Sequence, residues 1–596
     1  MKIKNIGKSL LLALSLSLLA SSCSNDTAVK EKEGSATTST SEGVFEASEK
    51  GYGGDVTAKV KITDGVIESV DFNADKETDT IGQKAIESLS KEIVDRQSTQ
   101  IETVSGATIS STAFLKAVNE ALKKGGINPE DLKAKEAKKE KIDLNQKADI
   151  VVIGAGGAGL TSAISAAQEG KSVIVVEKAA NAGGNTNRAT GGMNASETKF
   201  QKEAGINDSN EDFFEDTMKG GHNINNPDLV RVLVDNSSDS INWLDELGAR
   251  LSDVGVAGGA KNPRQHRPVD ENGKILSVGP YIVEKLLKKC EELNVPVIYN
   301  ARVEKIKQED GKIAGVTAST DQEELNVDSK AVIVASGGFG GSNDMVKKYR
   351  PDLDGYVSTN APTIEGDAIK FLEKLNAGFV DMDQIQTHPT VVQKDGSLIS
   401  ESLRGDGAIL LNKEGTRFTD EMGTRDAVSS AINEQTDKTA WLVVDQKMYD
   451  ESNVIKGYAD RNLLTKVEDV KALADFIGTD EKNVKESLEK WSNSVDNKED
   501  GEFNRKNLDK IKSNLKEGPY YVGPIGPGIH HTMGGVMIDT KAQVLDKDNQ
   551  VIEGLYAAGE VTGGVHGGNR LGGNAVSDII TFGRIAGKEA AGFVGK

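Results

Sequence analysis

A glycine-rich turn between a buried strand and a helix constrains this chain more than any other feature of its sequence. Residues 148–153 (ADIVVI) form an apolar run that predicts a buried parallel strand, and GAGGAG follows at residues 154–159. A helical pattern spans residues 160–169, and a second apolar strand at 172–176 ends at Glu177. Strand, glycine turn, helix, strand and acidic residue in this order predict a dinucleotide-binding Rossmann unit.

The residues of this turn have separate physical tasks. Gly154 permits the tight turn, Gly156 lets the backbone approach a pyrophosphate, and Gly159 lets the helix pack on the sheet. Glu177, 18 residues after Gly159, is placed to accept hydrogen bonds from ribose hydroxyls. An acidic residue here selects an unphosphorylated ribose, which leaves FAD or NAD as the dinucleotide.

Length and charge indicate the broad class. The 596 residues suffice for three or four domains, and 37% hydrophobic residues with 64 glycines are typical of an α/β enzyme. The formal net charge is −20, so nucleic acid and anionic membrane surfaces are poor partners. An anionic substrate would therefore need a local cationic pocket.

The N-terminus has the pattern of a targeting segment. Three lysines precede an apolar run at residues 10–20, which is too short to span a membrane as a mature helix. The run ends in LASSC, which resembles a bacterial lipoprotein cleavage site with Cys23 as the lipidated residue. We expect a signal peptide at 1–23 and a polar tether at 24–42; an ordinary signal peptide with a chance cysteine is the alternative. The resemblance implies an exported protein anchored only by lipid to the outer face of the cytoplasmic membrane, on the periplasmic side in a two-membrane host.

Cysteine usage limits the redox chemistry. With Cys23 assigned to lipid, only Cys290 is left, so no intrachain disulfide is expected. The sequence has no CxxCH haem motif and no cysteine cluster for iron–sulfur. We predict no metal site, so flavin would carry any electrons that this chain moves.

Residues 43–126 have the pattern of a small α+β module. Alternating apolar residues predict a strand at 56–62, and a second strand at 66–72 follows an Asp-Gly turn. An amphipathic helix is expected at 81–94, and the tetrapeptide SGAT, residues 105–108, precedes another helix.

This module resembles the FMN-binding domain of flavinylated electron-transfer proteins. In that family the threonine of SGAT carries FMN through a phosphodiester bond formed by a separate flavinyltransferase, so the resemblance implies covalent FMN on Thr108. Small neighbours leave the hydroxyl exposed, and a helix N-terminus favours phosphate. The family usually begins the motif with Asp, whereas this chain has Glu102. The alternative is that SGAT only caps a helix.

A charge-rich stretch at 127–147 predicts a solvated linker or exposed helix before the dinucleotide unit. Beyond that unit, segments at 183–186, 190–194, 332–338 and 554–560 resemble the flavin-contacting segments of the fumarate reductase/succinate dehydrogenase flavoprotein superfamily. This resemblance implies noncovalent FAD. The residues expected to contact it are Gly154, Gly156, Ala158, Gly159, Glu177, Asn185, Thr186, Gly191, Gly192, Asp367, Glu560, Asn574, Ala575 and Val576.

The same resemblance implies the domain order. The fold class is α/β, with a Rossmann-like FAD-binding domain at residues 148–391 and 523–596. An α+β clamp domain at 392–522 is inserted into it and would close over the substrate. The small α+β FMN-binding domain at 43–126 precedes both.

Five motifs resemble those of soluble fumarate reductases of the flavocytochrome c type. They are QTHPT at 386–390, SESLRG at 400–405, TRD at 424–426, HHTMGG at 530–535 and HGGNRLGGN at 566–574. The resemblance implies that Arg570 and His530 bind one carboxylate of the substrate. His388 and Ser400 would bind the other. A guanidinium suits a planar carboxylate because it can donate two parallel hydrogen bonds.

The resemblance also implies that Arg425 donates the proton. Glu401 and Arg404 would restore that proton as a relay, and Glu401 and Arg425 would also contact the substrate. Arginine is a weak acid, with a pKa above about 12. The carbanion left by hydride transfer is far more basic, and a second arginine in a dry site favours loss of the charge.

Three of the six histidines occupy family positions: His388, His530 and His531. His531 is expected to be structural. No role is assigned to the others, which are His222, His266 and His566.

The sequence therefore predicts an exported fumarate reductase that transfers hydride from FAD N5 and a proton from Arg425 to fumarate, giving succinate. Covalent FMN would supply electrons from a membrane quinol or a flavin carrier. Two alternatives stay open: a reductase of urocanate, acrylate, methacrylate or cinnamate, and a surface flavin carrier without catalysis. His388 with Ser400 favours a dicarboxylate, while Arg425 and Glu401 argue against a carrier. Related oxidases and steroid dehydrogenases lack the full set.

Overall fold

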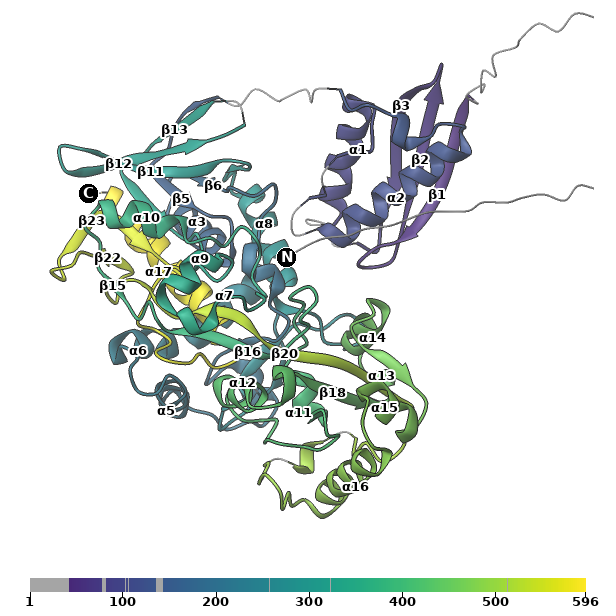
Figure 1. The fold of residues 1–596 in the computed structure, drawn as a ribbon. Coiled ribbons are helices and arrows are strands. Elements are labelled where there is room, and N and C mark those ends of the chain that lie inside the picture. The colour runs from purple at the N-terminus through teal and green to yellow at the C-terminus, as the bar shows by residue number, and fades with distance from the viewer. Residues whose placement is uncertain are drawn as a thin grey trace, which may run out of the picture.

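The computed structural model describes residues 42–595 except 78–81, 102, 105–106, 136–142, 257, 322, 507 and 512. The expected signal peptide, Cys23 and all but the last residue of the expected tether lie outside the described residues. So do Glu102, the first two residues of SGAT and the side chain of Thr108. None of the helices described is long and apolar enough to cross a membrane. Figure 1 shows a small N-terminal module, a large body and a lobe that contains α13 to α16.

The N-terminal module is a three-stranded antiparallel sheet packed against two helices. Its elements are β1 (Gly43–Lys50), β2 (Asp55–Thr63), β3 (Val66–Asn73), α1 (Lys84–Arg96), α2 (Thr108–Lys124) and the 3₁₀ turn η2 (Pro129–Asp131). In β2, alternate residues from Val56 to Ile62 are buried, as in a strand with one face in a core. The predicted strands and helices are present, and β1 and η2 are additional.

The dinucleotide-binding sheet has six strands in the order β10-β6-β5-β14-β23-β22. Its parallel strands are β5 (Ile150–Ile153), β6 (Val173–Val176), β10 (Val297–Ile298), β14 (Ala331–Val334) and β23 (Val551–Ala557), and β22 (Gln543–Leu545) is antiparallel to β23. Two helices pack beside it, α3 (Gly157–Gln168) and α17 (Asn574–Val594). α3 begins earlier than predicted, because the extended Gly156 already serves as its N-cap.

Smaller sheets complete the body. An antiparallel sheet contains β11 (Arg302–Glu309), β12 (Lys312–Ser319) and β13 (Glu324–Asp328), and β4 (Asn145–Lys147) joins β13 in parallel. The end of the expected linker is therefore part of a sheet. The remaining strands are β7 (Met193–Asn194), β8 (Asp253–Gly255), β9 (Gln265–Arg267), β15 (Phe379–Val380) and β21 (Gly535–Val536). The helical elements are η3 (Gly184–Arg188), α4 (Lys199–Glu203), α5 (Asn210–Gly220), α6 (Pro227–Asp235), α7 (Ser237–Glu246), α8 (Val278–Glu292), α9 (Asn343–Tyr349), η4 (Pro351–Leu353) and α10 (Asp367–Lys374).

The inserted lobe has a hydrophobic core of its own. Its strands are β17 (Ile409–Leu411), β18 (Ala440–Asp445), β19 (Thr465–Val467) and the first half of β20 (Tyr520–Thr532), whereas β16 (Ile385–Val391) belongs to the body. Its helical elements are α11 (Ser402–Asp406), α12 (Arg425–Asn433), η5 (Thr436–Lys438), α13 (Gln446–Glu451), α14 (Asn453–Asp460), α15 (Val470–Ile477), α16 (Glu481–Asn497) and η6 (Leu508–Lys510). The first half of β20 pairs with β18 and β19, and the second half pairs with β16. The boundary predicted at residue 522 thus falls inside one continuous strand that joins lobe and body.

The N-terminal module contacts both other parts. Ala85 and Ala107 are buried in the hydrophobic cluster of the body. On the other side, Lys50 Nζ lies 3.1 Å from Oδ2 of Asp460, the last residue of α14 in the lobe. Ala107 directly precedes Thr108, so the N-terminal end of α2 faces the body.

Candidate active site

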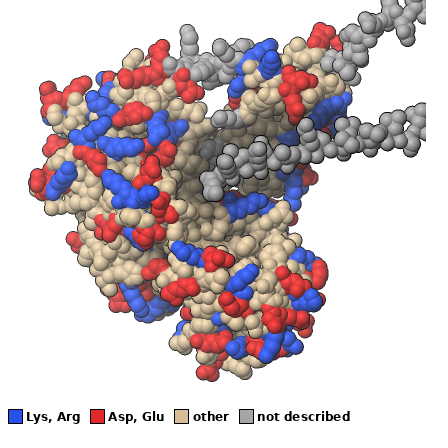
Figure 2. All heavy atoms as spheres, in the orientation of Figure 1, with Lys and Arg blue, Asp and Glu red and all other residues tan. Residues whose placement is uncertain are grey.

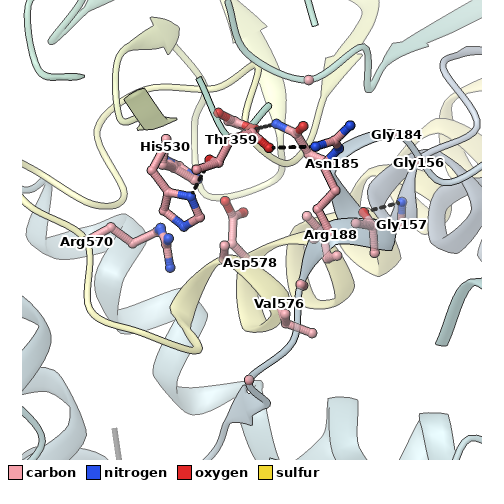
Figure 3. Close-up of a pocket in the computed structure, with 18 of the residues that line it drawn as sticks. Gly156, Gly157, Gly184, Asn185, Arg188, Thr359, His530, Arg570, Val576 and Asp578 are labelled. Atoms are coloured by element: carbon pink, nitrogen blue, oxygen red, sulfur yellow. Dashed lines mark hydrogen bonds between the residues drawn. The ribbon is translucent and has the colours of Figure 1, made fainter. Parts of the chain in front are cut away.

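A cavity of about 450 Å³ extends from the glycine turn before α3 to the inserted lobe. This volume is within the usual range for small-molecule sites. Figure 3 shows Gly156, Gly157 and Gly184 toward one end and His530 with Arg570 toward the other. The cavity therefore joins the predicted dinucleotide site to the predicted substrate site.

The glycine turn forms a cradle at the first end. Gly154 has a φ of +101°, and a Cβ there would lie 2.5 Å from a backbone carbonyl oxygen, so only glycine fits. A Cβ on Gly156 would meet no atom closer than 3.8 Å, which leaves this backbone open to the cavity. Glu177 accepts hydrogen bonds from the backbone nitrogens of Ala155 (2.7 Å) and Ala179 (2.8 Å), and burial raises its pKa. This arrangement fits a pyrophosphate at a helix N-terminus and a ribose beside a carboxylate.

Most of the residues expected to contact FAD line the cavity. They are Gly154, Gly156, Ala158, Glu177, Asn185, Thr186, Gly191, Gly192, Asp367, Glu560, Ala575 and Val576. Gly159 and Asn574 do not line it. A Cβ on Gly159 would lie 1.9 Å from the oxygen of Gly154, so this glycine serves the packing of α3. The side chain of Asn574 is held instead by Asn194 (2.7 Å) and Thr217 (3.1 Å).

Polar groups along the cavity also fit a flavin dinucleotide. Asp367 forms an ion pair with Lys178 at 2.7 Å, and Glu560 accepts a hydrogen bond from Asn185 Nδ2 at 3.0 Å. Ser336 Oγ is buried in the lining and has no hydrogen-bond partner among the described residues. The glycine cradle, the carboxylates of Asp367 and Glu560 and the hydroxyl of Ser336 therefore offer FAD hydrogen-bond partners along the cavity.

The other end of the cavity gathers imidazole and guanidinium groups. The rings of His388 and His530 lie edge to face, with 5.2 Å between their centroids. Burial and the charge of Arg425 lower the pKa of both histidines well below the usual value. Burial and Arg425 also lower the pKa of Arg570 to about 9. Neutral imidazoles beside two crowded guanidinium groups favour the binding of an anion.

The chain thus has the local cationic pocket that an anionic substrate requires. Arg425, Arg505 and Arg570 all line the cavity. On the outer surface, Figure 2 shows basic and acidic side chains interspersed over the face in view. Arg425 is paired with Glu401 and Arg505 with Glu421, whereas Arg570 has no ion-pair partner among the described residues, so of these three Arg570 is the cation free to bind an anionic substrate.

Arg425 is held between lobe and body. It is the first residue of α12, and its Nε donates to Glu401 Oε2 at 2.8 Å while its Nη1 donates to Gln386 Oε1 at 3.0 Å. Burial opposes ionisation of Glu401, but the charges of Arg425 and Arg404 outweigh it and hold the pKa of Glu401 below its usual value. Glu401 is therefore an ionised carboxylate in direct contact with Arg425.

Arg404 lies on α11, the short helix whose N-cap residue is Glu401, but outside the cavity lining. Its Nη1 donates to the backbone oxygen of Glu421 at 2.6 Å, and its Nε and Nη2 are buried with no partner in the part of the chain described. Burial lowers its pKa. No ion pair joins Arg404 to Glu401 among the described residues. Of the two residues expected to form the relay, Glu401 therefore contacts Arg425 directly and Arg404 does not.

Ser400 lines the cavity beside Glu401. Its Oγ lies 2.9 Å from Ser402 Oγ, and its backbone nitrogen donates to Tyr458 Oη at 2.9 Å. On the same wall, His388 Nε2 lies 4.0 Å from Glu401 Oε2. Four residues are expected to bind the carboxylates of the substrate. All four line this end of the cavity: His388, Ser400, His530 and Arg570.

The other histidines have different surroundings. His531 lines the cavity, and its ring lies 5.3 Å from that of His566, which pairs with Asp578 at 3.1 Å. His266 Nε2 lies 2.7 Å from Thr198 Oγ1, away from the cavity. His222 Nε2 lies 3.0 Å from Oδ2 of Asp426 in α12, and His222 does not line the cavity.

Two residues of the site have roles that the motifs did not reveal. Gln386 accepts a hydrogen bond from the guanidinium of Arg425 and donates one to the backbone oxygen of Arg570 at 2.8 Å, so it connects the two arginines. Thr359 Oγ1 lies 2.8 Å from Nδ1 of His530. Gln386 stood within a recognised motif, whereas no sequence signal marked Thr359.

Two family models match the chain. The FAD binding domain matches residues 149–576, and the FMN-binding domain matches residues 51–123. The solved open conformation of a flavocytochrome c3 fumarate reductase is 38% identical, with a TM-score of 0.65, and covers 78% of this chain and 85% of its own.

Named relatives agree with these models. The chain is 46% identical to the fumarate reductase (cytochrome) of Shewanella frigidimarina over 445 residues, which are 74% of this chain and 77% of that protein. It is 41% identical to the NADH:fumarate oxidoreductase of Klebsiella pneumoniae (strain 342) over 90% of its own length, and spans 56% of that longer protein. It is 36% identical to the urocanate reductase of Eggerthella lenta over 91% of both chains.

Fold, cavity and charged groups define a flavin-dependent oxidoreductase that acts on CH–CH groups. The chain belongs to the FAD-dependent fumarate reductase family and carries an FMN-binding domain fused to its N-terminal side.

Proposed function

We propose that this chain reduces fumarate to succinate in the cavity between body and lobe. The observation that carries the proposal is the position of Arg425, which shares the cavity wall with Arg570, His388 and His530. Electrons would arrive through FMN on the N-terminal module. Lipid on Cys23 would anchor the chain outside the cytoplasmic membrane, within reach of a quinol or flavin donor.

One carboxylate of the substrate would bind Arg570 and His530. Arg570 Nε is buried without a partner among the described residues, and a carboxylate supplies the acceptor that it needs. Thr359 engages Nδ1 of His530, which leaves Nε2 for the substrate. His388 and the Ser400 hydroxyl would bind the second carboxylate, so the alkene is fixed at both ends.

FAD, held by the glycine cradle and Glu177, would supply the hydride for one alkene carbon, and FMN on the N-terminal module would supply the electrons that restore it. Arg425 donates a proton to the neighbouring carbon. Glu401 contacts Arg425 at 2.8 Å and is the group best placed to return a proton after each turnover. Arg404, buried in the helix that begins after Glu401, would be the next residue along this path.

The contact between the N-terminal module and the body supports electron entry through FMN. Ala107 is buried against the body, and Thr108 follows it as the first residue of α2. Covalent FMN on Thr108, attached by a flavinyltransferase, would then lie on the side of the module that faces the FAD-binding domain. A helix N-terminus is also a favourable place for a phosphate diester.

A reductase of another unsaturated carboxylate is the second candidate. It is favoured by the match to a urocanate reductase over 91% of both chains. The pair of His388 and Ser400 argues for a second carboxylate and hence for fumarate.

A substrate panel with reduced viologen as electron donor separates the candidates. We expect turnover of fumarate by the wild type and almost none by Arg425→Ala. Acrylate and urocanate should be reduced much more slowly than fumarate. Faster reduction of urocanate than of fumarate would replace the proposed substrate, and absence of turnover with every carboxylate would favour an electron carrier.

A further inference from the structure

His222 connects the body to the helix that carries the proton donor. It follows α5 and has a φ of +60°, in the left-handed region. Its Nε2 lies 3.0 Å from Oδ2 of Asp426, in the first turn of α12. Asp426 is the neighbour of Arg425 in the chain, so this contact joins the segment after α5 to the first turn of the helix that carries the guanidinium.

The same histidine packs against the segment that carries Arg570. Gly568 donates its backbone N–H to the oxygen of Gly221 at 2.9 Å. A Cβ on Gly568 would lie 2.8 Å from Cδ2 of His222, so the imidazole rests directly on this backbone. One side chain thus contacts both the support of Arg570 and the helix of Arg425.

Two further observations single out the contact with Asp426. Oδ1 of Asp426 is buried and accepts no hydrogen bond from the residues that the structure describes. The carboxylate therefore depends on His222, which donates to its other oxygen, Oδ2. At the opposite end of α12, Asn433 accepts a hydrogen bond from Tyr356 of the body at 3.1 Å. Side-chain hydrogen bonds therefore join α12 to the body at both ends. Of these two, the bond between His222 and Asp426 is the one next to Arg425.

We infer that His222 is a positioning residue for proton transfer: through Asp426 it keeps Arg425 aligned with the substrate that Arg570 binds. This inference rests on the proposed function. Neither His222 nor Asp426 lines the cavity, so neither is expected to contact the substrate itself. A reacting group displaced by about 1 Å can lose about a hundredfold in rate.

The test variant is His222→Asn, because asparagine tolerates the left-handed backbone but is too short to reach Asp426. Tyr356→Phe is the matched control at the far end of α12. With reduced viologen and fumarate, we expect kcat of His222→Asn to fall by about tenfold to a hundredfold, with KM within about threefold of the wild type. The solvent isotope effect on kcat should increase, since protonation becomes slower. Tyr356→Phe should behave as the wild type, and His222→Gln, which can reach Asp426, should recover part of the rate.

Hydrogen exchange gives a readout independent of turnover. Amides of α12 from Val428 onward should exchange faster in His222→Asn, and the amides nearest Arg425 should be unaffected in Tyr356→Phe. If the wild type fails to reduce fumarate, the proposed function is wrong and the exchange data still decide whether His222 fixes the helix. Wild-type exchange in α12 of His222→Asn, or wild-type kcat and isotope effect in an enzyme that reduces fumarate, would overturn the inference.

Discussion

Nε of Arg425 lies 2.8 Å from Oε2 of Glu401, so the expected proton donor and its carboxylate form a direct ion pair. Both belong to the inserted lobe, and both face Gly572 of the body. A Cβ on Gly572 would lie 3.4 Å from Arg425 Nη2 and 3.5 Å from Glu401 Oε1. The acid–base pair therefore meets the FAD-binding domain at a glycine, which lets the two parts approach closely.

Glu401→Gln should slow turnover while preserving the shape of the site. The amide keeps a hydrogen bond to Arg425 but cannot return a proton. We expect kcat for fumarate to fall by about 10² to 10⁴ with a smaller change in KM, measured with reduced viologen. Glu434→Gln, at the exposed C-terminal end of α12, is the control and should keep the wild-type rate. Equal rates for the two variants would remove Glu401 from the proton path.

Thr108→Ala should separate the two flavins. The variant should lose covalently bound FMN but keep FAD and viologen-driven fumarate reduction, because viologen can reduce FAD directly. Flavin fluorescence in a denaturing gel and intact mass report the attachment. Thr112→Ala, one turn further along α2, should keep it. Flavin still attached in Thr108→Ala would disprove this site of modification.

The buried histidines predict how the stability of the flavin-free protein depends on pH. Burial lowers the pKa of His388, His530 and His531 well below the usual value. The unfolded chain therefore takes up protons at these residues near pH 6.5 while the folded chain does not, so stability should fall as pH decreases through about 6.5. Melting temperatures measured between about pH 8 and 5 should show this decrease, and His531→Gln should show less of it. A variant with the wild-type slope would contradict the neutral state inferred for His531.

Arg570 should account for much of the affinity for dicarboxylates. Succinate at about 100 times its Kd should stabilise the wild type by about 2.7 kcal/mol, seen as a rise in Tm. Arg570→Gln should lose most of this rise, because the amide offers no cation to the carboxylate. Arg350→Gln, which removes a cation that pairs with Asp352 outside the cavity lining, should keep it. An undiminished rise in Arg570→Gln would place the carboxylate elsewhere.

Local patterns predicted the parts of the site that depend on local geometry. The glycine cradle around Gly156 and the acidic residue after β6, Glu177, follow from a strand–turn–helix pattern, and both line the cavity. The family motifs placed Arg425 and Arg570 in one site. Asn574, in contrast, does not line the cavity, and its side chain bonds Asn194, a contact between distant segments that no local pattern predicts.

Contacts between segments that are far apart in the chain could not be predicted from local sequence patterns. Gln386 bonds two arginines that are 145 residues apart in the chain, and Thr359 reaches His530 only because a backbone hydrogen bond joins their segments. The lobe boundary expected at residue 522 falls inside β20, because this one strand pairs with β16 of the body and with β18 of the lobe in a single sheet. His222 had no motif, since its partner Asp426 lies 204 residues away.

In the proposed reaction, Arg425 protonates an alkene held against the flavin site. The most direct measurement is stopped-flow absorbance of dithionite-reduced enzyme mixed with fumarate. We predict rapid reoxidation of FAD in the wild type and reduced flavin that persists in Arg425→Ala, with fumarate still bound. Reoxidation of the variant at the wild-type rate, or a wild type that stays reduced, would contradict the account.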